Sequence, residues 1–137
     1  MFDKDNKLTM DISDKEIIEI LQKYYSNKFG SEVKVESKLG IKYVNTVDGC
    51  IVSRPDIEFY IFDKNGNQSI TSPLTKYDIK EALNDYVSSL GYSFESFKYI
   101  GGIRHIGQFI DDDTPYFEGI KVYYREKSMH KKLVLWK

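Results

Sequence analysis

Few side chains in this sequence combine the type and the spacing that catalysis needs. Histidine occurs only as His105 and His130, and Cys50 is the single cysteine. A nucleophilic serine or cysteine needs a base beside it, and a cysteine-based zinc site needs several thiolates. No such spacing is visible, and we expect Cys50 to be a partly buried, inert thiol. The sequence therefore predicts no catalytic residue, no metal site and no cofactor.

One segment carries oxygen ligands at the spacing of a calcium-binding loop. Asp63, Asn65 and Asn67 alternate as do the first ligands of an EF-hand loop. The pattern then fails, because Gln68 stands where that loop needs glycine and Leu74 where it needs a bidentate glutamate. The Asn-Gly pair at 65–66 is instead typical of a hairpin turn. We therefore predict a turn here.

Two more segments carry residue types that can bind an ion. Residues 101–107 read GGIRHIG and supply Arg104 and His105, but the lysine and serine or threonine of a phosphate-binding loop are absent. Paired glycines in a strand more often mark a bulge. Residues 111–113 are consecutive aspartates, which favour an exposed loop tip. We predict a bulge and a loop, and their roles stay open.

An internal repeat outlines the elements that must position these residues. Residues 13–26 read SDKEIIEILQKYYS and residues 75–88 read TKYDIKEALNDYVS. The segments are identical at Ile17/Ile79, Glu19/Glu81, Leu21/Leu83, Tyr24/Tyr86 and Ser26/Ser88. The apolar spacing predicts amphipathic helices over 14–29 and 76–90. Two such helices can also converge on one pattern, so duplication and convergence both stay open.

The helix ends carry matching signals. Ser13 with Glu16, and Thr75 with Asp78, have the spacing of a capping box. Gly30 and Gly91 stand where each helix should stop.

Strand patterns follow both helices. Polar and apolar residues alternate over 33–43, 51–62, 93–105 and 116–126, and short strands are expected at 68–71 and in the tail, 127–137. The sequence therefore predicts an α+β fold in the order α-β-β-(β)-α-β-β-(β). We expect one antiparallel sheet with both helices packed on one face. Residues 1–137 would form a single domain whose repeated halves cover about 11–72 and 73–137.

Composition narrows the classes of function. The chain has 137 residues, a net charge of −1 and 41% hydrophobic residues, which is a foldable composition. The neutral balance argues against a dedicated nucleic-acid binder. The N-terminus lacks the apolar core of a signal peptide, no apolar run is long enough for a membrane span, and a lone cysteine suits a reducing compartment. We expect a cytoplasmic protein without a membrane partner.

Basic and aromatic residues on the outer face of the sheet form the candidate interaction surface. They are Lys34, Lys38, Lys42, Tyr60, Lys121, Tyr123 and Arg125, with Trp136 in the apolar end of the tail as a further candidate. Tyrosine and arginine are favoured at protein interfaces, and aromatic and basic residues together can also stack bases. An ordinary solvated face would carry the same residue types.

Three hypotheses of function follow. The first is a small non-catalytic cytoplasmic protein that binds a protein partner, as an accessory, inhibitor or immunity-type protein does. In one version of this hypothesis a mobile element encodes the protein, and in another the protein forms a homodimer. The second is a nucleic-acid-binding module that uses the lysine and tyrosine face. The third is a small-molecule enzyme or sensor with a pocket near Arg104, His105 and Cys50.

Overall fold

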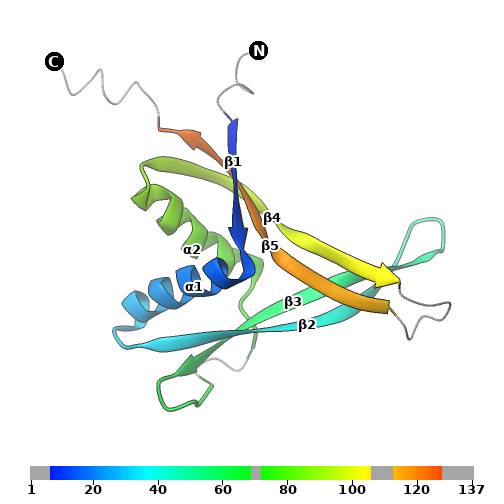
Figure 1. Cartoon of the computed structure of the whole chain (residues 1–137), viewed down its shortest axis with the longest axis horizontal. Helices are drawn as coiled ribbons and strands as arrows, with labels where there is room; N and C mark the ends of the chain where they lie inside the picture. Colours follow the sequence, from blue (N-terminus) through cyan, green and yellow to red (C-terminus); the bar gives the residue numbers. More distant parts are fainter. Residues whose placement is uncertain (1–6, 69–71, 106–112, 128–137) are drawn as a thin grey trace.

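A computed structural model describes residues 7–68, 72–105 and 113–127. The elements in chain order are β1 (Lys7–Ser13), α1 (Asp14–Phe29), β2 (Val33–Asn45), β3 (Ile51–Asp63), α2 (Lys76–Ser89), β4 (Tyr92–His105) and β5 (Asp113–Glu126) (Figure 1). The α+β class and the order α-β-β-α-β-β are confirmed. Strand β1 was not expected. The strands expected at 68–71 and in the tail fall almost wholly outside the described residues.

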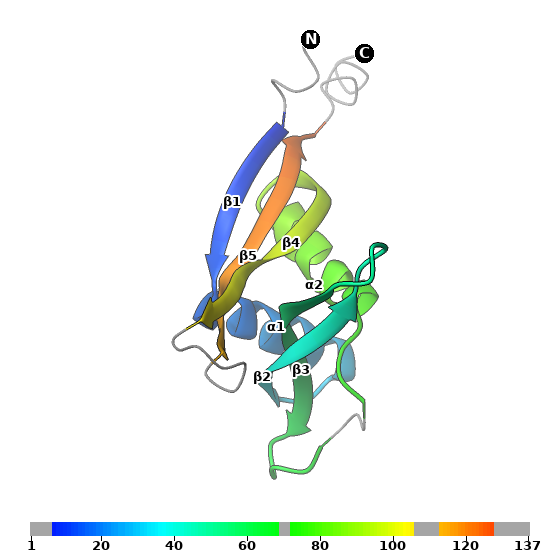
Figure 2. The same ribbon diagram turned by 90° about the vertical axis from the view of Figure 1, so that its right-hand side faces the viewer.

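All strand pairs are antiparallel, and they form two hydrogen-bonded ladders. One has the order β1-β5-β4 and the other is the β2–β3 hairpin, where the sequence led us to expect a continuous sheet. Strand β1 pairs with residues 119–125 of β5 and forms one edge of the first of these ladders. Both helices lie on the same side of the strands, as Figures 1 and 2 show.

The two helices begin in the same way. The Ser13 hydroxyl accepts from the Glu16 amide at 3.1 Å, and the Glu16 carboxylate accepts from the Ser13 amide at 3.2 Å. In α2 the Thr75 hydroxyl accepts from the Asp78 amide at 3.2 Å, and the Asp78 carboxylate accepts from the Thr75 amide at 2.9 Å. Both predicted capping boxes are thus confirmed, and each satisfies amides that the first helical turn cannot.

The repeat extends from the helices into the hairpins. Matching helix positions are fully buried, as in the pairs Ile17/Ile79 and Leu21/Leu83. The strand register corresponds as well: Val35 faces Ile61 in one hairpin as Phe97 faces Val122 in the other, and Ser37 faces Phe59 as Tyr99 faces Ile120. A bulge at Glu95 adds one residue to β4 relative to β2. The hairpins therefore follow the helices in the same order, and duplication and convergence both stay open.

A shared core joins the two repeats. Its buried residues are Ile12, Ile17, Leu21, Tyr25, Val33, Val35, Phe59, Ile61, Ile79, Ala82, Leu83, Val87, Ile120 and Val122. The Tyr25 hydroxyl donates to the Asp78 carbonyl at 3.2 Å and so ties α1 to the first turn of α2. Burial, with the nearby Asp78 carboxylate, raises the pKa of Tyr25.

Two glycines allow close strand approach. A bulge was predicted at the Gly101-Gly102 pair; the register does shift between Ile100 and Gly101, but the extra residue is Glu118 on the facing strand β5. A β-carbon at Gly101 would overlap the carbonyl oxygen of Tyr116. Gly119, at a φ of 147°, would overlap the carbonyl oxygen of Ile12 in the same way. Glycine therefore lets β5 approach both of its neighbours.

Candidate interaction surface

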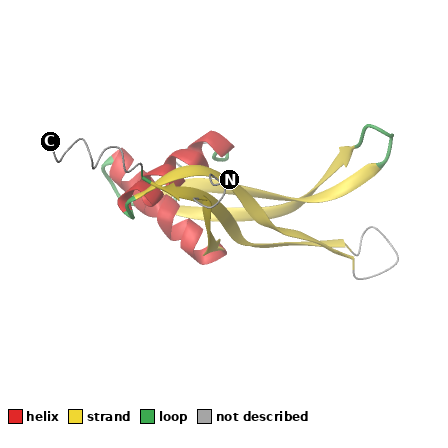
Figure 3. Cartoon of the chain, turned by 90° about the horizontal axis from the view of Figure 1, so that it is seen from above, coloured by secondary structure: helices red, strands yellow, loops and turns green. Residues whose placement is uncertain are grey.

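The β2–β3 hairpin extends well past the helices that cover its base (Figures 1 and 3). Helix α1 has 16 residues and β2 has 13, but a helix rises about 1.5 Å per residue and a strand about 3.3 Å. Strand β2 is therefore longer than helix α1. Residues 38–58, which we call the hairpin arm, lead from the first turn of α1, where Leu39 and Ile57 lie beside Asp14 and Lys15, out to the turn of the hairpin.

Exposed apolar side chains are concentrated on the hairpin arm. The described part of the chain has eight exposed large hydrophobic residues, and the arm carries five of them: Leu39 (37% exposed), Tyr43 (50%), Val47 (108%), Ile51 (68%) and Val52 (38%). Single exposed apolar residues are ordinary, but a cluster on one projecting element is typical of an interaction site.

The turn of the hairpin arm has a fixed conformation. The Thr46 amide donates to the Cys50 carbonyl at 2.7 Å, and the Thr46 hydroxyl accepts from the Cys50 amide at 3.1 Å. Gly49 has a φ of 89°, as the left-handed position of a short hairpin loop requires. The Thr46 hydroxyl also donates to Asp48 and lowers the pKa of that carboxyl group. Val47 is thereby held out in solvent.

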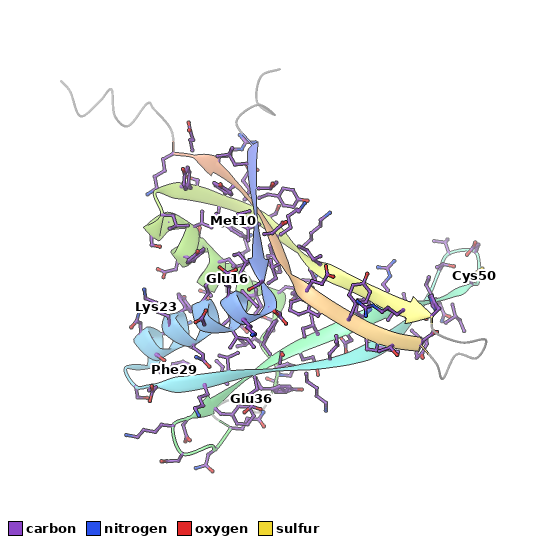
Figure 4. All side chains as sticks on the ribbon, in the orientation of Figure 1. Met10, Glu16, Lys23, Phe29, Glu36 and Cys50 are labelled. Carbon is purple, nitrogen blue, oxygen red and sulfur yellow. The ribbon has the colours of Figure 1, made fainter. Side chains whose placement is uncertain are left out.

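Cys50 is exposed, so the expectation of a partly buried thiol is wrong. Figure 4 shows it at the far end of the hairpin arm. It directly follows a turn that no helix covers, which leaves its side chain open to solvent. Its residue type gave no sign of this, because free cysteine is usually a buried residue.

The strand register places the predicted surface residues of the β2–β3 hairpin on one of its two faces. Lys34, Lys38 and Lys42 lie on the same side of the β2–β3 hairpin as Tyr60. Carboxylates share that face: Glu58 faces Lys38 and accepts a 3.0 Å hydrogen bond from the Tyr60 hydroxyl, which raises the pKa of Tyr60. The face is therefore mixed in charge rather than basic.

A shallow hollow of about 510 Å³ opens on this side of the hairpin. Its lining residues are Glu36, Ser37, Lys38, Tyr60, Phe62 and Gln68.

The remaining predicted surface residues lie on the other ladder. Lys121, Tyr123 and Arg125 are on β5, where the Lys121 ammonium lies 4.0 Å from Asp11 and Arg125 forms an ion pair with Glu95. The seven strand residues therefore do not share one continuous sheet, because the two ladders are separate. Trp136 lies outside the described residues.

The residues considered for a small-molecule pocket do not come together. The Arg104 guanidinium lies 4.8 Å from the centre of the Tyr116 ring, and His105 Nδ1 lies 2.7 Å from the Asp113 carboxylate. These residues end the β4–β5 hairpin, and Figure 2 shows that end well separated from the turn that carries Cys50. Four hollows on the described part of the chain are lined by other side chains.

The segment with calcium-like spacing forms a turn. The Asp63 carboxylate accepts from the amides of Asn65 and Asn67, each at 2.9 Å, and so is engaged by the backbone. The Gly66 amide donates to the Asp63 carbonyl at 3.0 Å. Across residues 7–68, 72–105 and 113–127, no three His, Cys, Asp or Glu side chains gather as a metal site. Residues 106–112, with most of the acidic run, are not described.

Comparison of the chain with protein-family models, curated proteins and solved structures finds no match. Neither described helix is long and apolar enough to cross a membrane.

Sequence reasoning missed the apolar end of the hairpin arm. Its signal was present, because Val47 and Ile51 flank an Asp-Gly pair at 48–49 and such pairs favour hairpin turns. We expected a loop at this point, and the reach of the strands past the helices decides that these side chains stay exposed.

Proposed function

We propose that the protein is a small, non-catalytic, cytoplasmic binding protein that acts by burying a surface of another protein against its hairpin arm. The observation that carries this proposal is the cluster of exposed apolar side chains on the arm. Burial of such side chains in an interface removes apolar surface from water, which contributes about 25 cal/mol per Å². The fixed turn lowers the entropy cost of binding, because Val47 and its neighbours are already held in place.

The charges of the arm favour a protein partner over a nucleic acid. Its lysines share a face with carboxylates, Lys38 facing Glu58, and the whole chain has a net charge of −1. Nucleic-acid binding depends on a basic excess that neutralises phosphates. Burial of a partner's surface would serve an accessory protein, an inhibitor or an immunity-type protein, including one encoded by a mobile element.

The test compares two substitutions at equally exposed apolar positions. Ile51 on the arm and Tyr77 on α2 are both 68% exposed. Tagged full-length wild type, Ile51→Asp and Tyr77→Asp would be used to capture proteins from lysate of the native source, and the affinity for the captured protein would be measured. We expect Ile51→Asp to weaken binding at least about tenfold, because its carboxylate would be desolvated in the interface. Tyr77→Asp should bind as the wild type does.

Three results would contradict the proposal. Capture of no protein is the first, and equal binding by Ile51→Asp and Tyr77→Asp is the second. The third is capture that nuclease abolishes and that weakens steeply with salt, which would support the nucleic-acid alternative.

A further inference from the structure

The backbone of β2 leaves one edge of the hairpin arm open. The bond from the Thr46 amide to the Cys50 carbonyl, with the register of the hairpin, places the even-numbered residues of β2 in hydrogen-bonded pairs with β3. The odd-numbered residues therefore direct their N–H and C=O groups away from β3. Near the helix these outward groups have partners: the Val33 amide donates to Ser26 at 3.1 Å and the Val35 amide to Gln22 at 3.0 Å.

From Leu39 onward the outward groups have no partner within the described residues. These groups belong to Leu39, Ile41 and Tyr43, and two of the three side chains are largely exposed: Leu39 by 37% and Tyr43 by 50%. A strand edge with unpaired amides and apolar side chains is a template for pairing with another strand.

The opposite edge of the hairpin is interrupted at three positions. On β3, the Phe59 carbonyl accepts from the Leu74 amide at 2.8 Å, and the Asp63 amide donates to the Asn67 carbonyl at 2.8 Å. Pro55 lies at an outward position of the same strand and has no N–H to donate. The chain thus protects β3 with a proline and with bonds to neighbouring segments, whereas β2 has no proline and its lysines all lie on one face.

The other two edge strands differ from β2 in their side chains. Neither β1 nor β4 carries an exposed large hydrophobic residue among the positions described. Of the edge strands, β2 alone combines open backbone groups from Leu39 onward with exposed apolar side chains and no proline.

We infer that the β2 edge binds the β2 edge of a second copy of the chain, antiparallel, around a two-fold axis at Ile41. In this register Ile41 faces its own counterpart, and Leu39 faces Tyr43 of the second copy. Odd-numbered residues face odd-numbered residues, as the outward hydrogen bonds require. Apolar side chains therefore meet apolar side chains on one face, and such cross-strand pairs stabilise a sheet.

The lysines of β2 disfavour the two neighbouring registers. Around Ile41, Lys42 faces Gly40 and Lys38 faces Val44 of the second copy, so no two lysines are opposed. A register around Gly40 would place Lys38 opposite Lys42, and a register around Lys42 would oppose Lys42 to itself. Like charges directly opposite each other destabilise strand pairing. The strand is thus complementary to itself in the register that its apolar residues favour.

The result would be a continuous four-stranded sheet of order β3-β2-β2-β3. Its outer strands would be the protected β3 edges, so pairing would stop at two copies. The face of this sheet that carries Lys38 and Tyr60, and the turn with Val47 and Ile51, would remain accessible, while the opposite face, with Val35 and Phe59, packs in the core. The inference therefore does not depend on the proposed protein partner, and its failure would leave that proposal standing.

The test measures assembly of the full-length chain with two matched proline variants. Ile41→Pro removes an outward amide on β2, and Ser53→Pro removes an outward amide on β3, so neither removes a hydrogen bond within the hairpin. Sedimentation velocity over increasing concentration should show a monomer–dimer equilibrium for the wild type and for Ser53→Pro. Ile41→Pro should remain monomeric at every concentration, with an unchanged circular dichroism spectrum.

A distance measurement tests the register without a substitution. Cys50 is the only cysteine and is exposed, so a nitroxide label can be attached to the native chain. With the axis at Ile41, pulsed electron spin resonance should give a separation of roughly 35 Å between labels, from the spacing of residues along strands and of strands across a sheet. This distance measurement still tests the inference if Ile41→Pro fails to fold.

The inference is overturned if the wild type is monomeric at all concentrations. The inference is also overturned if Ile41→Pro dimerises as the wild type does, or if both proline variants lose dimerisation equally. A label separation below about 20 Å would overturn it as well, since a parallel pairing would bring the labels within about three strand spacings.

Discussion

Gly119 is a residue at which even the small change to alanine should strongly lower the free energy of unfolding. It has a φ of 147°, and a β-carbon there would overlap the backbone of β1. We expect Gly119→Ala to lower the free energy of unfolding by about 3 kcal/mol or more, from backbone strain and displacement of β1. Gly40→Ala is the control, because Gly40 has open space within 4 Å; it should change stability by less than about 1 kcal/mol. Urea denaturation of dilute protein measures both, and equal losses would contradict this account.

Residues whose roles are local were predictable from the sequence, and those with distant partners were not. The capping box of Ser13 and Glu16 is complete within one helical turn, so spacing alone indicates it. Gly119 needs glycine because of Ile12, which is far away in the chain and belongs to a strand that was not expected. For Cys50, exposure depends on the reach of a whole hairpin.

Among the elements, β2 should show alternating protection of its backbone amides. Beyond Val35, amides of even-numbered residues such as Lys38 and Lys42 bond to β3, while those of Leu39 and Tyr43 point away. In dilute protein, hydrogen exchange followed by NMR should be slow at Lys38 and Lys42 and close to the unprotected rate at Leu39 and Tyr43. Raising the concentration should slow exchange at the odd-numbered positions alone. Slow exchange at Leu39 and Tyr43 in the dilute monomer would mean that the chain itself covers this edge.

Period-two alternation located four of the strands but could not assign them to ladders. Alternation tells which face of a strand is buried, and the partner of each edge is settled by contacts between distant segments. The missed β1 shows the same limit: Leu8, Met10 and Ile12 alternate with polar residues, but seven residues beside a chain end are a weak signal. It pairs with β5, and the strands form two ladders in place of the one expected sheet. The candidate surface changed accordingly, from one lysine and tyrosine face to the hairpin arm.

At the scale of the whole molecule, the two repeats should unfold together. Both contribute to a single core, in which Ile17 and Leu21 of α1 pack with Ile79 and Leu83 of α2, and the Tyr25 hydroxyl bonds to the second helix. If one repeat unfolded, the buried side chains of the other repeat would lose their packing partners. Urea unfolding of dilute protein should therefore give coincident transitions by far-ultraviolet circular dichroism and by tyrosine absorbance.

Tyr25→Phe tests the connection between the repeats. The substitution keeps the buried ring and removes the hydroxyl that bonds to the Asp78 carbonyl. We expect a loss of about 1 kcal/mol in the free energy of unfolding, with the transitions still coincident, because packing rather than this one hydrogen bond joins the halves. Two separated transitions, in the wild type or in Tyr25→Phe, would show that each αββ repeat is an independent folding unit. A single transition would instead show that the two halves depend on each other for stability.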